Sequence, residues 1–179
     1  GLQPDADALA LLAERLEVNL LAAAQEIEKL RLFSENNIID ADTIAAAVAD
    51  NARYDVFGLI DRAIAGDVRG SLKILQGLKA EGTEPLALLW AITRELRTLC
   101  HCAEQIAQGN GIDRVLQGQR VWDKRKAMTK SALQRLNTQQ LRQLIIAANR
   151  TDQSVKGIVK DNSWILLEQL VAKMAGAAL

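Results

Sequence analysis

Residues that build covalent or metal-bound frameworks are scarce in this sequence. Among its 179 residues there are one histidine, two cysteines and two prolines, and aromatic residues make up only 3%. Two cysteines are too few for a disulfide framework, so we expect a reducing compartment, the cytosol. The scarcity of proline and of β-branched runs favours helices almost throughout the chain.

Long apolar runs are also absent. Runs such as residues 86–92 are far shorter than the roughly 20 apolar residues that a membrane-spanning helix needs, so no membrane partner is expected. The N-terminal residues are acidic and lack the basic region of a secretory signal peptide. A hydrophobic content of 49% with 25% charged residues is typical of a soluble globular protein.

Candidate catalytic and cofactor sites are few. The segment 66–71 is rich in glycine, but it has no lysine for a nucleotide phosphate and follows no predicted strand, so helix-end glycines explain it better. Cys100 and Cys102 flank the single histidine, His101. On a helix, residues two apart point about 200° away from each other, so the two thiolates cannot bind one zinc ion. We therefore expect two buried thiols, and no catalysis, cofactor or metal site.

Charge is separated along the chain although the net charge is zero. Residues 1–50 contain 3 basic and 10 acidic residues, whereas residues 51–179 contain 19 basic and 12 acidic residues. The whole positive excess is found in residues 114–142, which hold eight basic residues and one acid, Asp123. Such a separation indicates two parts that face different partners.

Apolar periodicity predicts three short helices in the acidic part, one opening at Pro4 and Asp5, one near residues 20–30 and one near residues 40–49. Together they predict a small three-helix domain over residues 1–51. The polar residues around Asn51 form a natural joint.

The second part, residues 54–179, has the pattern of a larger helical bundle. Gly66 and Gly82 are expected to end its first two helices, and Pro85 to open a long third one that ends near Gly109. Three more helices are predicted at residues 122–136, at residues 139–155 with Thr138 as the cap, and at residues 164–174. The fold class that follows is all-α, a small three-helix bundle followed by a larger helical bundle.

The basic helix is the best candidate for a functional surface. The candidate contact residues are Arg120, Trp122, Lys124, Arg125, Lys126, Lys130 and Arg135. They suit either the neutralisation of nucleic-acid phosphates or docking to an acidic protein subunit, and a merely solvated basic helix is the third reading. Because no aromatic residues alternate with the basic ones, any DNA contact would involve the backbone.

The three tryptophans are expected to differ in role. Trp90 and Trp164 lie on apolar helix faces and are predicted to anchor the core. Trp122, flanked by charges, is predicted to anchor an interface, where tryptophan and arginine contribute much of the binding energy.

Five segments, in this order and spacing, resemble the delta-subunit family of bacterial DNA polymerase III. They are NLLAAAQEIEKL (19–30), ARYDVFGLIDRAIAGD (52–67), EGTEPLALLWAITREL (81–96), RVWDKRKAMTKSALQRL (120–136) and WILLEQL (164–170). The resemblance covers essentially the whole chain, but only about the C-terminal half of that family's chain.

The resemblance implies a place in the pentameric clamp loader, which opens the sliding clamp and places it on primed DNA. Residues 1–51 would be the three-helix lid of an AAA+ module, and residues 54–179 the collar that joins the five subunits. The implied partners are the ATPase subunits and delta-prime, with the clamp reached through an N-terminal domain that these residues do not include.

The residues themselves also argue against an ATPase. An active AAA+ lid typically supplies an arginine from its third helix, and the predicted helix at residues 40–50 contains no basic residue. We therefore expect a non-catalytic subunit of a polymerase holoenzyme. The alternative is a helical nucleic-acid-binding module that uses residues 120–136.

Overall fold

The computed structural model describes residues 3–4, 27–28, 31, 38–39 and 52–177. By its internal contacts the chain divides into two compact units, Gly1–Tyr54 and Asp55–Leu179. Most of the three helices predicted for the acidic part lie outside the described residues. The lid-like and collar-like assignments of residues 1–51 and 54–179 stay predictions.

In the first unit, β1 (Gln3–Pro4) pairs in parallel with β2 (Ile38–Ile39). The prediction that Pro4 opens a helix is therefore wrong at that residue, because it lies in a strand end, where a missing N–H is tolerated. These two-residue strands are the only ones among the described residues, and the all-α fold class is confirmed. Residues 27–28 and 31 are helical, as predicted.

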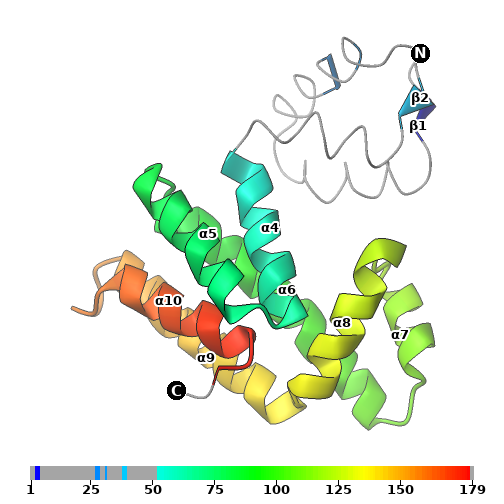
Figure 1. Ribbon diagram of the computed structural model, residues 1–179. Helices are drawn as coiled ribbons and strands as arrows, with labels where there is room; N and C mark the ends of the chain where they lie inside the picture. The colour runs from blue at the N-terminus through cyan, green and yellow to red at the C-terminus, as the bar shows by residue number, and fades with distance from the viewer. Residues whose placement is uncertain (1–2, 5–26, 29–30, 32–37, 40–51, 178–179) are drawn as a thin grey trace. The chain divides into compact units, whose positions relative to one another are not determined.

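The second unit is built from seven helices (Figure 1), which follow the predicted order with one addition. They are α4 (Ala52–Ala65), α5 (Val68–Ala80), α6 (Pro85–Ala107), α7 (Ile112–Gly118), α8 (Asp123–Arg135), α9 (Thr138–Val155) and α10 (Ser163–Met174). The sequence analysis did not predict α7, because seven residues are too few to establish a helical period.

The helix ends follow from local chemistry. Gly66 adopts a φ of +89° directly after α4, and the Asp67 carboxylate accepts a 2.8 Å hydrogen bond from the Gly70 N–H at the start of α5. Pro85 occupies the first turn of α6, as predicted. The cap of α9 is Asn137 rather than the predicted Thr138, because Asn137 forms a reciprocal capping box with Gln140.

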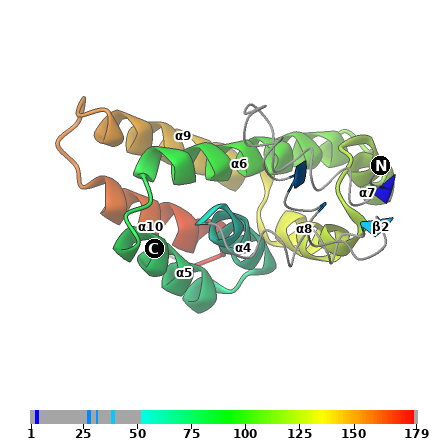
Figure 2. The same cartoon turned by 90° about the horizontal axis from the view of Figure 1, so that it is seen from above.

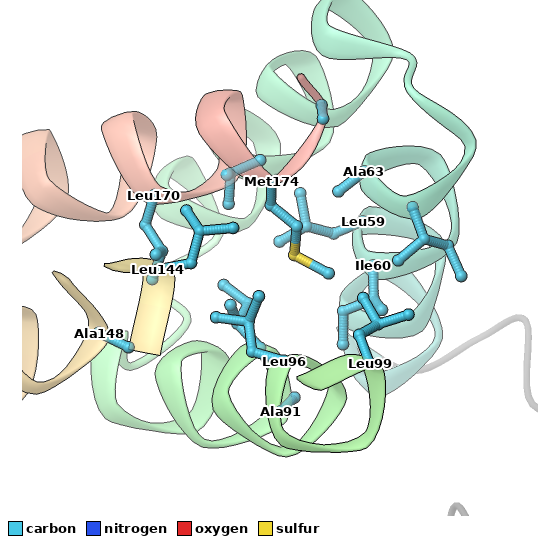
Figure 3. Packing of buried hydrophobic residues seen from close by; sticks show 14 of the residues in the cluster. Leu59, Ile60, Ala63, Ala91, Leu96, Leu99, Leu144, Ala148, Leu170 and Met174 are labelled. Carbon is cyan, nitrogen blue, oxygen red and sulfur yellow. The ribbon is translucent and has the colours of Figure 1, made fainter. Parts of the chain in front are cut away.

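The main core gathers buried side chains from six helices, α4, α5, α6, α8, α9 and α10. Figures 1 and 2 show α6 beside α9, and α10 against both α9 and α5. Figure 3 shows side chains from α4, α6, α9 and α10 packed together, among them Leu59, Leu96, Leu99, Leu144 and Met174. Leu59, Leu96 and Leu99 are fully buried, so α4 is held to the bundle by apolar packing.

A second, smaller apolar cluster joins α7 and α8 to the end of α6 that lies away from α5 and α10 (Figure 2). Cys102 belongs to this cluster, whereas Cys100 belongs to the main core, which confirms that both thiols are buried and face different ways. Burial raises the pKa of the Cys102 thiol to about 11.

The two tryptophans that were predicted to anchor the core differ in their burial. Trp164 is half-buried against the main core, but the Trp90 side chain is 52% exposed. The prediction for Trp90 is therefore wrong: Leu89 and Ile92 face the core, and a helix turns Trp90 about 100° from Leu89. No helix among the described residues is sufficiently long and apolar to cross a membrane.

Candidate subunit or nucleic-acid interface

The seven candidate contact residues follow the chain from the α7–α8 loop to the C-terminal end of α8. The structure brings them onto one helix and its preceding loop, but it gives them different contacts. Two of the arginines bind other helices of the same unit, and the remaining residues lie nearer to solvent.

Arg125 connects α8 to two other helices. Its Nε donates to Asp61 Oδ1 of α4 at 2.9 Å, and its Nη2 donates to Glu95 Oε2 of α6 at 3.0 Å. The Arg125 side chain is only 15% exposed, and that of Glu95 only 12%. Charge-assisted hydrogen bonds of this kind are stronger than neutral ones, and they orient α8 on the bundle.

Arg135 connects the end of α8 to the ends of two helices. Its Nη2 donates to the carbonyl oxygens of Ala63 and Ile64, at 3.3 and 3.0 Å, and to that of Met174 at 3.4 Å. These carbonyls belong to the last turns of α4 and α10, which lack intrahelical donors and carry the negative end of the helix dipole. Burial lowers the pKa of the Arg135 guanidinium, and its buried Nε has no hydrogen-bond partner among the described residues.

Two glycines leave room for the Arg135 side chain. Gly66 and Gly176 follow α4 and α10 with φ values of +89° and +93°. A Cβ atom at Gly176 would lie 2.6 Å from Arg135 Cδ, and one at Gly66 would lie 3.1 Å from Nη1. The same glycines therefore end the helices and admit the arginine that caps them.

Two of the three lysines on α8 have exposed acidic partners. Lys126 pairs with Asp123 three residues earlier on α8, and Lys130 pairs with Asp113 of α7. The two aspartate side chains are 72% and 79% exposed. Such pairs contribute little to stability, so either lysine can exchange its carboxylate for an outside anion.

The α7–α8 loop presents Arg120 and Trp122, and Lys124 follows in the first turn of α8. Arg120 is exposed and has a φ of +52°, while its N–H and that of Val121 donate to the carbonyls of Gln117 and Leu116, both at 3.0 Å. This is the bonding of a Schellman motif, in which glycine usually holds the position that Arg120 holds here.

Trp122 stands directly before α8 and is half-buried. Its buried indole Nε1 has no hydrogen-bond partner among the described residues, and Lys124 Nζ lies 5.4 Å from the centroid of its ring.

Four basic members of the set define what we call the α7–α8 basic surface. Arg120 and Lys124 are exposed, and Lys126 and Lys130 are partly exposed. This surface offers cationic donors for a phosphate or a carboxylate. The described residues hold no group of three His, Cys, Asp or Glu residues suited to a metal ion. The tethering contacts of Arg125 and Arg135 were not foreseen, because their partners lie 30 to 72 residues away in sequence and no local pattern connects them.

The sequence matches one protein family and is similar to two bacterial proteins. Residues 56–179 match the family model described as the processivity clamp loader gamma complex, DNA polymerase III C-terminal region. The chain is 35% identical to DNA polymerase III subunit delta of Escherichia coli K12 over 154 residues, which cover 86% of the chain and 45% of that protein. It is 28% identical to the Haemophilus influenzae subunit delta over 182 residues, which cover 97% of the chain and 53% of that protein.

The fold is also similar to a solved structure. The DNA clamp loader delta protein of Bacillus subtilis matches with a TM-score of 0.61 at 21% identity, over 98% of this chain and 52% of that one. At that identity the likeness concerns the fold. The chain spans about half the length of each of these relatives.

Proposed function

Because the chain belongs to the family of the C-terminal region of the DNA polymerase III clamp loader gamma complex, we propose that it is the assembly region of a clamp-loader delta subunit. The observation that carries the proposal is the match over residues 56–179, which is nearly the whole of the second unit, Asp55–Leu179. In this role the unit is a collar that holds the loader subunits together while the sliding clamp is opened.

The structure of the second unit supports a mechanical role. Its main core is continuous through α4, α6, α9 and α10, and close-packed interiors transmit displacement because they compress little. Since α4 carries Leu59 and Ile60 into that core, the chain that enters the unit is fixed to it. A rigid collar of this kind would hold the preceding parts of the subunit at a defined place in the ring.

We further propose the partners and setting that go with this role. The partners are the ATPase subunits and delta-prime, and the clamp is contacted by a part of the subunit outside these residues. The subunit itself catalyses no step, residues 1–51 serve as a lid, and the complex works in the bacterial cytoplasm.

The α7–α8 basic surface is proposed as a second contact area, either for the DNA backbone or for an acidic subunit. Lys126 and Lys130 pair with highly exposed carboxylates, so a polyanion can displace those carboxylates and release counterions. Trp122 borders this surface directly before α8, and its ring lies 5.4 Å from Lys124 Nζ. A free-standing nucleic-acid module using residues 120–136 remains the alternative.

Reconstitution tests the assembly role. The subunit that contains this chain is mixed with purified ATPase subunits and delta-prime of the same organism, and complex formation is measured by sedimentation and native mass spectrometry. We expect a stoichiometric loader complex. A subunit that stays free under conditions in which the ATPase subunits and delta-prime associate with each other would contradict the collar assignment.

A further inference from the structure

Helix α6 has a second face that its own unit does not cover. Leu88, Leu89 and Leu96 point into the core, with exposures of 0 to 3%. On the other side, Leu86 is 47% and Trp90 52% exposed, and Arg97, seven residues after Trp90 on the same helix, is also exposed. The spacing of Leu86, Trp90 and Arg97 places them along one stripe of the helix surface.

This stripe borders a groove of about 830 Å³ between α6 and α9, two helices that lie side by side (Figure 2). The inner wall includes the buried residues Leu89 of α6 and Ala148 of α9, together with Ile145. Leu86 and Trp90 add large exposed apolar surface at the rim. An exposed tryptophan beside an apolar groove is the usual anchor of a protein interface.

The polar residues of the groove carry a net positive charge. Three of them are basic, Arg94, Arg97 and Lys156, and one is acidic, Asp152. Lys156 Nζ donates to Asp152 Oδ2 at 2.6 Å, so the acid is matched within the groove, and the Arg94 guanidinium lies 5.8 Å from the centroid of the Trp90 ring. The electrostatic complement of this surface is an apolar segment flanked by carboxylates.

We propose that the α6–α9 groove binds an acidic amphipathic helix of a neighbouring clamp-loader subunit, an inference that rests on the proposed function. Apolar residues at helical spacing on that helix would pack between Trp90 and the wall formed by Ile145 and Ala148. Its Asp and Glu side chains would face Arg94 and Arg97. This is the helix-in-groove mode of recognition, in which apolar anchors give affinity and flanking charges give register.

The chemistry of the groove favours this occupant over two others. Nucleic acid would leave the apolar wall of Leu89 and Ile145 facing phosphates, which gain nothing from it. A second copy of the chain, packed face to face through the same groove, would place Arg94 and Arg97 opposite the same arginines, and like charges oppose such a contact.

Site-specific crosslinking and two substitutions in the full-length subunit test the proposal. With a benzophenone amino acid at position 90, we expect a crosslink to an acidic helix of an adjacent subunit in the reconstituted loader. Trp90→Ala should weaken association with the other loader subunits by about 30-fold, the effect of losing an interface hot spot. Arg97→Glu should weaken it by about 10-fold and reverse its salt dependence.

Matched controls come from exposed positions outside the groove. Ile165 of α10 is 51% exposed, and Arg69 of α5 is exposed. Ile165→Ala and Arg69→Glu should leave association unchanged, and circular dichroism should show that all four variants keep the helical content of the parent.

The outcomes separate this proposal from the collar assignment. If the unaltered subunit fails to join the loader, the proposed function is wrong and the inference falls with it. If the subunit joins, but Trp90→Ala and Arg97→Glu bind as tightly as their controls, the groove proposal alone is wrong. A crosslink from position 90 within the same chain, or a loss of binding to a duplex oligonucleotide without loss of subunit association, would also overturn it.

Discussion

At the scale of single residues, the charge of this protein has two uses that composition does not distinguish. Arg125 and Arg135 contribute to the positive total, yet both donate to groups of other helices in the same unit. Arg120, Lys124, Lys126 and Lys130 carry the same charge nearer to solvent. The first pair is accordingly expected to affect stability, and the second set to affect binding.

Arg135→Ala is expected to destabilise the protein by about 2–3 kcal/mol. The substitution leaves the last-turn carbonyls of α4 and α10 without their charged donor, and hydrogen bonds to charged groups are among the stronger ones. Urea denaturation followed by circular dichroism measures the change. The control is Arg150→Ala, which removes a pair with Asp161 on the surface and should cost less than about 1 kcal/mol. Equal effects of the two substitutions would show that Arg135 does not cap these helices.

Gly176→Ala should destabilise more than Gly82→Ala. Both glycines have positive φ, so each alanine costs about 1 kcal/mol in backbone strain. At Gly82 the new methyl group meets nothing within 4 Å, whereas at Gly176 it lies 2.6 Å from Arg135 Cδ and displaces that side chain. Thermal melts of the two variants give the comparison, and similar melting temperatures would contradict the contact.

At the scale of elements, each helix depends on a short stretch at its boundary. α5 begins at Asp67, which accepts from the Gly70 N–H and forms a 2.7 Å ion pair with Arg62. These two interactions lower the pKa of the Asp67 carboxyl below its ordinary 3.8. The start of α5 is therefore tied to a titratable group.

The stabilisation by Asp67 should be complete above pH 3.8 and should be lost as the pH falls through the lower pKa of the folded state. The reason is that a depressed carboxyl pKa makes folding favour the ionised form. The protection of the Gly70 amide relative to its intrinsic exchange rate at each pH, measured by NMR between pH 5 and pH 2 (about the range in which carboxyls titrate), should fall at the acid end. In Asp67→Asn the amide still caps the helix but does not titrate there. Persistence of the same pH dependence in that variant would point to another group.

Substitutions in α8 distinguish the two proposed partners of the basic surface, DNA and an acidic subunit. If the surface binds DNA, Lys126→Gln with Lys130→Gln should reduce the slope of log K against log salt by about 2, since each phosphate contact contributes roughly 0.9. Fluorescence anisotropy with a primed duplex measures the slope. Arg69→Gln with Lys73→Gln on α5 is the control, because both residues are exposed and carry the same charge. An unchanged slope in the α8 variant would leave an acidic subunit as the partner of this surface.

At the scale of the whole molecule, the chain consists of two compact units with their own internal contacts. The family match begins at residue 56, and the apolar core of the second unit begins with Val56. A chain that starts at Ala52 would retain the whole of α4 and of that core.

Residues 52–179 are accordingly expected to fold alone and to associate with the other loader subunits. A cooperative thermal transition of this piece, together with its incorporation into a reconstituted complex, is the expected result. Residues 1–51 serve as the matched test piece, since we propose a lid role and not an assembly role for them. If the larger piece folds but only the intact subunit assembles, the acidic part contributes to assembly and the collar assignment is too narrow.

Much of the second unit could be predicted because its signals are local. Gly66, Gly82 and Pro85 mark helix ends through backbone geometry alone, and the spacing of Leu89, Ile92 and Leu96 identifies the buried face of α6. The short helix α7 escaped the same reasoning, because its length gives no period, and the cap at Asn137 was assigned one residue late. Family resemblance supplied the proposed role, which periodicity does not reveal.

The contacts of the candidate site residues were harder to predict from the sequence. From the sequence, Arg125 and Lys126 are adjacent members of one basic run, and only the packing of α8 against α4 and α6 makes the first a tether and leaves the second paired at the surface. In the same way, Trp90 is a large apolar residue within an apolar run, as core residues often are. It is exposed because it lies on the side of α6 that borders the groove beside α9.

Local sequence is sufficient for the all-helical class, the order of most helices and the positions of their ends, because these depend on neighbours within one or two helical turns. Only the packing of the helices shows which cations are internal tethers, which tryptophan is exposed and where a groove remains. Those properties depend on carboxylates and carbonyls 30 to 72 residues away and on the packing of α6 beside α9, and no local pattern records such distances.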